Sequence, residues 1–185
     1  MRLRRQLGTL AALALTAAMF ASPAHAQVRN SAASPISVRA QLGQSLTVSL
    51  SGSAVNFNLV AGNANNPGST SITATTSWTL NEIISLVTVY AFFGSSTVAL
   101  TDGAGDNIPS ADFQISDNGG AFTALTNTAP FGGANAGLSL GSTLIFGNNT
   151  SSRTDVMKFN INLSPLPNLP PGTYTGTLTI QAQAI

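Results

Sequence analysis

Apolar and polar residues alternate along most of the chain, which is the pattern of β-strands with one buried and one solvent-facing side. The alternation predicts strands within 34–42, 45–50, 54–60, 70–80, 155–163 and 174–185. The run ISLVTVYAFF, residues 84–93, is apolar on both faces and predicts a central strand. The stretch 80–86 has a spacing that a helix could also use, but it is short, and we interpret it as a strand edge or a single turn. No helix is predicted elsewhere.

Clusters of Gly, Asn and Asp separate these runs and mark turns, as in GNANNPGS, TDGAGDN and SDNGG. Short strands separated by turn signals over this length predict an all-β fold, an immunoglobulin-like antiparallel β-sandwich of about seven to ten strands. Residues 99–141 are the least regular, and we expect long loops there around two or three short strands.

The first 26 residues predict a cleaved signal peptide. They combine a basic start, an apolar stretch from Leu7 to about Ala21, and the small-residue site Ala24-His25-Ala26. Residues 27–185 then form a single domain of ordinary size, in which 27–42 is either an N-terminal extension or the first strand. We expect an exported protein, located in the periplasm, at the cell surface or outside the cell, without a transmembrane segment.

Loss of the signal peptide changes the charge and the available chemistry. The chain has seven basic and six acidic residues, and three of the basic ones lie in residues 1–26, so the remainder carries four against six, about −2. This leaves no basic patch for nucleic acid. The only His, His25, is lost with the signal peptide, and the chain has no Cys. Catalytic sites that need imidazole or thiolate are therefore excluded, and we expect no enzyme and no cofactor.

Four acidic residues gather in the loop region 102–117. Asp102, Asp106 and Asp112 are candidate calcium ligands, because loops rich in carboxylate oxygens can hold this ion. Their spacing does not match an EF-hand loop, and Asp-Gly and Asp-Asn pairs are also ordinary turn formers. The loop 102–117 thus supports an alternative function, a secreted module that binds a glycan or calcium.

The sequence has few of the charges that protect exposed strand edges. Only ten charged residues remain after residue 26, and only one is Lys. β-Proteins commonly use Lys and other charges to prevent unwanted edge-to-edge pairing. Such a chain either covers its edges or uses them to pair with another strand.

The segment PPGTYTGTLTIQAQAI resembles the closing strand of secreted pilin-like sandwich subunits of the chaperone–usher and spore coat protein U type. Gly172, Thr173 and Tyr174 match the turn of those families, and Thr175 to Ile185 match the strand. The chain departs from the spore coat protein U pattern because it has no cysteines.

The resemblance implies assembly by β-strand donation. Tyr174, Leu178 and Ile180 would belong to the assembly strand that also meets an export chaperone. An apolar N-terminal segment would complete the fold of a neighbour, and its candidate residues are Ile36, Val38, Ala40 and Leu42. A self-complete sandwich, in which 34–42 pairs within its own domain, remains open at this point. In both cases we expect an exported structural or adhesive surface protein, whose partners are itself or other surface subunits.

Overall fold

The computed structural model describes residues 34, 36–40 and 43–185, so the predicted signal peptide and Leu42 lie outside the described residues. The chain divides into two compact units, Met1–Ala40 and Gln41–Ile185. The second unit is an antiparallel β-sandwich, as the alternation predicts, and the fold below is that of this unit.

Two long strands form the frame of the sandwich. β3 (Ile72–Phe92) and β8 (Gly137–Ile161) pair antiparallel, from Ile72 opposite Met157 to Phe92 opposite Gly137. Their register shifts between Asn81 and Ile84, and Gly147 on the facing strand has a φ of 63°, a value that favours glycine.

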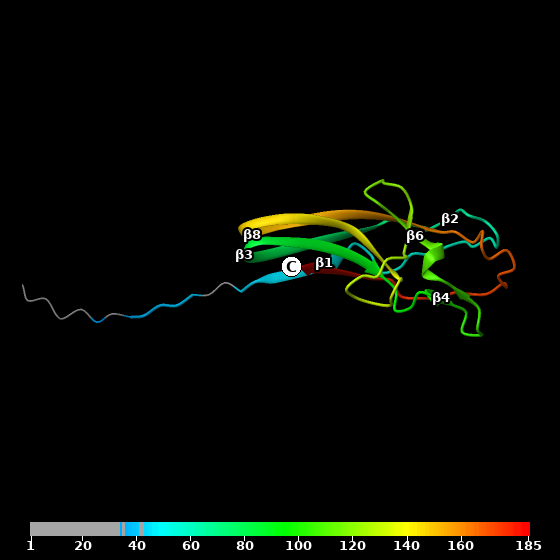
Figure 1. The fold of residues 1–185 in the computed structure, drawn as a ribbon, viewed down its shortest axis with the longest axis horizontal. Helices are drawn as coiled ribbons and strands as arrows, with labels where there is room; N and C mark the ends of the chain where they lie inside the picture. The colour runs from blue at the N-terminus through cyan, green and yellow to red at the C-terminus, as the bar shows by residue number, and fades with distance from the viewer. Residues whose placement is uncertain (1–33, 35, 41–42) are drawn as a thin grey trace, which may run out of the picture. The chain divides into compact units, whose positions relative to one another are not determined.

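The ribbon of β3 and β8 folds back on itself at this irregularity. Trp78 and Val87 lie on opposite sides of the bulge along β3, and both belong to one buried cluster. The two halves of the ribbon therefore stack as the two layers of the sandwich (Figure 1). We call the end of the domain at residues 81–84 and 146–149 the bend end. The loops 61–65, 102–106 and 162–172 lie at the other end, the loop end.

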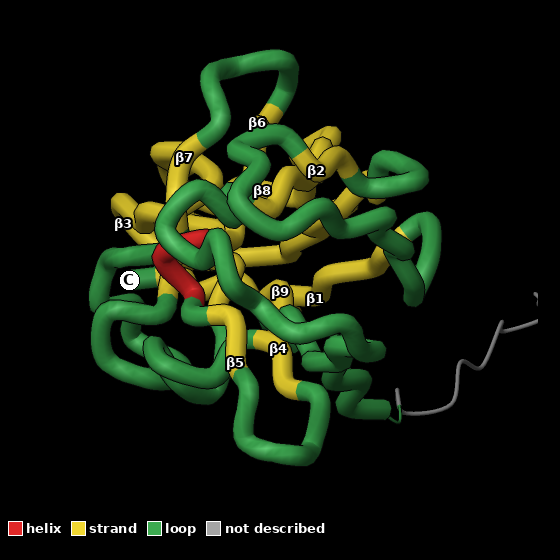
Figure 2. The backbone as a smooth tube through the Cα atoms, turned by 90° about the vertical axis from the view of Figure 1, so that its right-hand side faces the viewer, coloured by secondary structure: helices red, strands yellow, loops and turns green. Residues whose placement is uncertain are grey.

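Short strands extend both layers. β1 pairs with the first half of β3, and β9 pairs with the second half, so the two border one side of the sandwich (Figure 2). β2 and β6 pair with the last residues of β8, β7 pairs with β6, and β4 pairs with β5. Their bounds are β1 Ser45–Leu50, β2 Asn66–Pro67, β4 Leu100–Thr101, β5 Asn107–Ile108, the 3-10 helix η1 Ser110–Asp112, β6 Phe113–Asp117, β7 Thr123–Ala124 and β9 Thr179–Ala184.

The core lies between the layers. Phe113 is its aromatic centre and makes edge-to-face contacts with Phe57 and Phe93, at ring-centroid distances of 5.7 and 5.1 Å. Met157 and Ile161 of β8 are fully buried beside it. The smaller cluster at the bend end contains the only Trp, whose indole Nε1 donates a hydrogen bond of 2.9 Å to Asn149 Oδ1.

The structure differs from the sequence prediction in four places. Of the predicted strand 174–185, only Thr179–Ala184 forms β9. The predicted strands 70–80 and 84–93 are one strand, because the bulge at the bend keeps the pairing with β8 continuous. The predicted strand 54–60 makes only one isolated bridge, Phe57 with Gly68. The described residues of the predicted strand 34–42 belong to no strand, and Ile36 and Val38 are each 87% exposed.

Candidate binding groove

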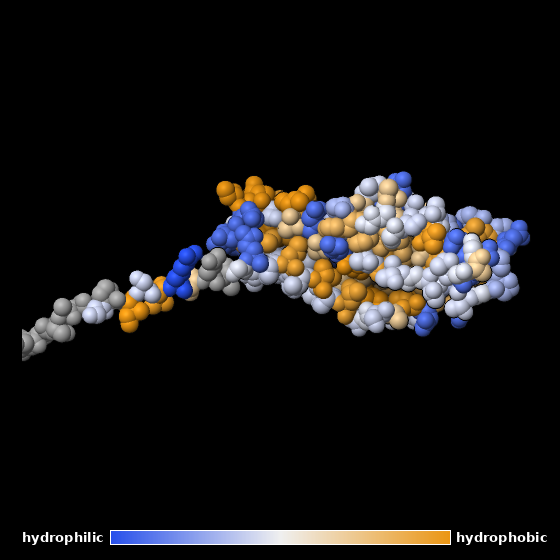
Figure 3. All heavy atoms as spheres, turned by 90° about the horizontal axis from the view of Figure 1, so that it is seen from below, coloured by the Kyte–Doolittle hydropathy of each residue, from blue (hydrophilic) through white to orange (hydrophobic). Residues whose placement is uncertain are grey.

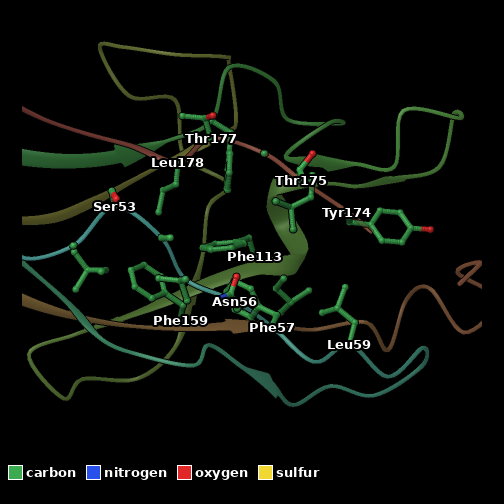
Figure 4. Close-up of a pocket in the computed structure, with 18 of the residues that line it drawn as sticks. Ser53, Asn56, Phe57, Leu59, Phe113, Phe159, Tyr174, Thr175, Thr177 and Leu178 are labelled. Atoms are coloured by element: carbon green, nitrogen blue, oxygen red, sulfur yellow. The ribbon is translucent and has the colours of Figure 1, made fainter. Parts of the chain in front are cut away.

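A groove with an apolar floor opens along the side of the sandwich that β1 and β9 border. Its cavity measures about 810 Å³ and lies between two wall segments, residues 50–59 and residues 172–178. The floor consists of core side chains from both layers, among them Phe93, Phe113 and Phe159 (Figure 4). The groove therefore reaches the centre of the hydrophobic core.

The first wall continues β1 toward the loop end. Val55, Phe57 and Leu59 are half-buried and alternate with exposed residues, so one apolar face of the segment points at the core. The backbone N–H and C=O of Asn56 both point toward Ser69. The N–H donates to Ser69 Oγ at 3.1 Å, and the carbonyl accepts from the Ser69 N–H at 2.8 Å. In an extended segment the neighbouring residues point their N–H and C=O to the opposite edge, which here is the groove.

The second wall leads into β9. The N–H and C=O of Thr175 both bond to Thr101, at 2.9 Å each, so the backbone of Tyr174, Gly176 and Leu178 faces the groove. A side chain at Gly176 would collide with the carbonyl oxygen of Ala99, which explains the glycine at this crossing. Leu178 points into the cavity (Figure 4).

The two walls are not joined to each other. Both lie wholly within the described part of the chain, and no backbone hydrogen bond connects them. The groove thus offers unpaired backbone groups along its rims and alternating apolar side chains below. This arrangement suits an extended peptide, since the rims supply hydrogen bonds and the floor takes every second side chain.

The candidate assembly residues fall into two groups. Tyr174, Leu178 and Ile180 all line the groove. Ile36, Val38 and Ala40 lie in the first unit and are exposed, while Leu42 lies outside the described residues. The hydroxyl of Tyr174 donates a hydrogen bond to the Pro170 carbonyl at 2.9 Å. The pKa of Tyr174 is raised, mainly by desolvation and further by the carboxylates of Asp106 and Asp102.

The acidic loop has a local structural role. Oδ1 of Asp102 accepts the backbone N–H groups of Ala104, Gly105 and Asp106 at 2.8, 3.1 and 3.0 Å. These hydrogen bonds lower the pKa of Asp102, and the one from Ala104 has the largest effect. Asp112 is buried elsewhere, in η1, and burial raises its pKa. The structure does not bring Asp102, Asp106 and Asp112 together, and the described residues contain no group of three acidic side chains placed to hold a metal ion.

Sequence reasoning missed the floor of the groove. Phe113 occurs in the irregular region 99–141, where no periodic pattern indicates a buried residue. The alternation of Val55, Phe57 and Leu59 was a usable signal, but it predicts an ordinary strand and not the rim of an open groove.

No known protein-family model matches this chain, and no curated protein matches its sequence. Within the described residues, no helix has the length and apolar character needed to cross a bilayer.

Proposed function

We propose that the protein is an exported, non-enzymatic structural subunit of a surface assembly, and that it joins its neighbours by accepting and donating a β-strand. The observation that supports this proposal is the groove, which has buried core side chains as its floor and lies between two segments with unpaired backbone edges. The wall side chains Val55, Phe57 and Leu178 are only half-buried, and an inserted strand would cover their remaining apolar surface and form hydrogen bonds with the rims.

The proposed donor is residues 34–42 of a second copy. Ile36, Val38, Ala40 and Leu42 occur at every second position, so all four can face the floor of the groove. Only Gly43 and Gln44 separate this segment from β1. Before assembly, an export chaperone that supplies a comparable strand would protect the groove, and the location would be the periplasm, the cell surface or the extracellular space.

The test uses a protein that lacks residues 27–42, so that it has no donor strand of its own, and a synthetic peptide of residues 34–42. We expect a one-to-one complex that survives unheated SDS electrophoresis and dissociates on heating. A peptide with Val38→Asp should not bind, because it would place a charge on the apolar floor.

A pair of variants at neighbouring positions provides the matched control. Leu178→Asp places a carboxylate in the groove, and Thr179→Asp places one at the next residue, which is exposed and does not line the groove. Only Leu178→Asp should abolish peptide binding, with circular dichroism confirming that both proteins are folded. Equal binding by the two variants, or no binding by the unmodified groove, would refute strand acceptance.

A further inference from the structure

A compact apolar patch lies on the outer face of the sandwich at the bend end (Figure 3). Ile84 pairs with Phe146 across β3 and β8, and Leu86 pairs with Leu144 one step further along. Ile185 continues the second row, since it exchanges backbone hydrogen bonds with Leu86. We call these five residues and Ile83, in the bulge, the bend patch. Ile83 is 89% exposed and Phe146 65% exposed.

The bend patch departs from the rule for this fold. Outward positions of a sandwich are normally polar, and a contiguous apolar cluster on a monomer marks an interaction site. A stable protein–protein interface takes roughly 20–30 residues from each partner, and the bend patch has six. The patch therefore suits a secondary contact between two molecules that a stronger contact already holds together.

The first strand of the sandwich begins at the bend end, where the bend patch lies. β1 starts at Ser45, opposite Thr79 and close to the bulge at Asn81. Gln44 Nε2 also donates to Glu82 Oε1 at 3.4 Å, which holds the start of β1 at the bend end. A strand donated through the short link of Gly43 and Gln44 thus brings the bend end of its own domain against the acceptor.

The position of the groove determines which end of the acceptor domain the donor domain contacts. Its walls at 50–59 and 172–178 lie toward the loop end, whereas β1 and β9 contact each other nearer the bend. A tethered strand must therefore enter from the loop end, with its Gly43 side outermost. It then runs antiparallel to 172–178, the pairing that is slightly more stable per residue.

We infer that the bend patch packs against the loop end of the next copy of this chain, at the segment Pro165–Pro170. This segment is rich in Pro and Leu and borders a shallow hollow of about 440 Å³ together with Gly105, Asp106 and Asn107. The inference rests on the proposed function. The contact joins two different surfaces, so repeated addition builds a head-to-tail chain. Because the donated strand already holds the two domains together, the local concentration of the patch is high and a small contact is sufficient.

The absence of cysteine in the chain allows a direct test on residues 27–185. A double variant, Phe146→Cys with Pro167→Cys, is assembled and treated with a short bis-maleimide reagent. We expect heat-resistant cross-links between successive copies. Val156→Cys with Pro167→Cys is the control, since Val156 is also an exposed apolar residue of β8 but pairs with Thr73, far from the bend.

A second measurement compares assembly without a cross-linker. Phe146→Ser and Leu144→Ser should raise the protein concentration needed for half-assembly by about tenfold or more, the effect of removing a buried apolar anchor. Val156→Ser should leave it unchanged. All three side chains are exposed in the single domain, so the fold is retained.

The outcomes separate the two proposals. In one outcome the chain assembles and Leu178→Asp blocks assembly, but the patch variants assemble like the unmodified chain and give no specific cross-links. Strand donation then stands, and the bend-patch contact is overturned. Cross-links from Phe146→Cys to a second Phe146→Cys, and not to Pro167→Cys, would also overturn it, because they indicate a symmetric contact. If the unmodified chain forms no heat-sensitive ladder, both proposals fail together.

Discussion

Arg153 and Asp155 form a buried ion pair in the sandwich, and its removal should be strongly destabilising. The Asp155 side chain is completely buried, and the Arg153 guanidinium donates to it through Nε at 2.8 and 3.0 Å and through Nη2 at 2.6 Å. Arg153 also lies 3.9 Å from Asp117. Arg153→Ala would leave two carboxylates together without a cation among the described residues around them.

The expected magnitude follows from this burial. Removing one partner of a buried ion pair costs about 3–5 kcal/mol, because the remaining charge is neither hydrated nor paired. The Arg153 side chain is 21% exposed, so we expect the lower end, about 3 kcal/mol. For a domain of this size that corresponds to a fall in Tm of about 6–12 °C.

The assay is urea unfolding of residues 27–185, followed by the fluorescence of Trp78, which is buried and is the only Trp. Lys158→Ala is the control, since Lys158 is an exposed cation on the same strand and should change stability by less than about 0.5 kcal/mol.

The loss should also depend on pH. The pKa of Asp117 is raised by burial and then by the charge of Asp155, and Arg153 opposes both. Without Arg153 the folded-state pKa of Asp117 rises further above its unfolded value. A raised carboxyl pKa favours the folded state at low pH, and this stabilisation is lost as pH rises through the folded pKa. The deficit of Arg153→Ala is therefore largest at neutral pH and shrinks on acidification. A deficit below 1 kcal/mol at pH 7, or one that grows at low pH, would refute the reasoning.

Two further predictions concern Asp112 and Gly141. Asp112 is buried, its Oδ2 has no hydrogen-bond partner among the described residues, and burial raises its pKa, so the carboxylate form opposes folding above that pKa. Asp112→Asn should raise Tm at pH 7 but not at pH 3, and calorimetry at these two pH values measures the difference. An equal rise in Tm at both pH values would contradict the expected pH dependence. Gly141→Ala should cost about 1–3 kcal/mol, because the new methyl group would overlap the Arg153 guanidinium. Gly94→Ala is its control, since nothing lies within 4 Å of a Cβ there, and a similar loss in both variants would point to the backbone instead.

The sequence by itself determined the class of fold. Alternation along 45–50, 70–80, 155–163 and 174–185 predicts half-buried strands, because period two is a local property of a strand with one buried face. β1 matches the first run, β3 and β8 contain most of the next two, and β9 contains only Thr179–Ala184 of the last. The two-sided apolar run 84–93 is likewise central, with β8 on one side and β9 on the other.

Only the tertiary structure decided that the long strands run through both layers of the sandwich, and where the groove lies. The fold-back of β3 and β8 depends on a bulge at 81–84 facing Gly147, and no local pattern distinguishes it from a turn between two separate strands. The alternation of Val55, Phe57 and Leu59 specifies an apolar face but not whether a neighbouring strand covers it. That depends on contacts with Phe113 and Leu178, which are distant in sequence. The same holds for the bend patch, where residues of β3 and β8 and Ile185 meet only after folding.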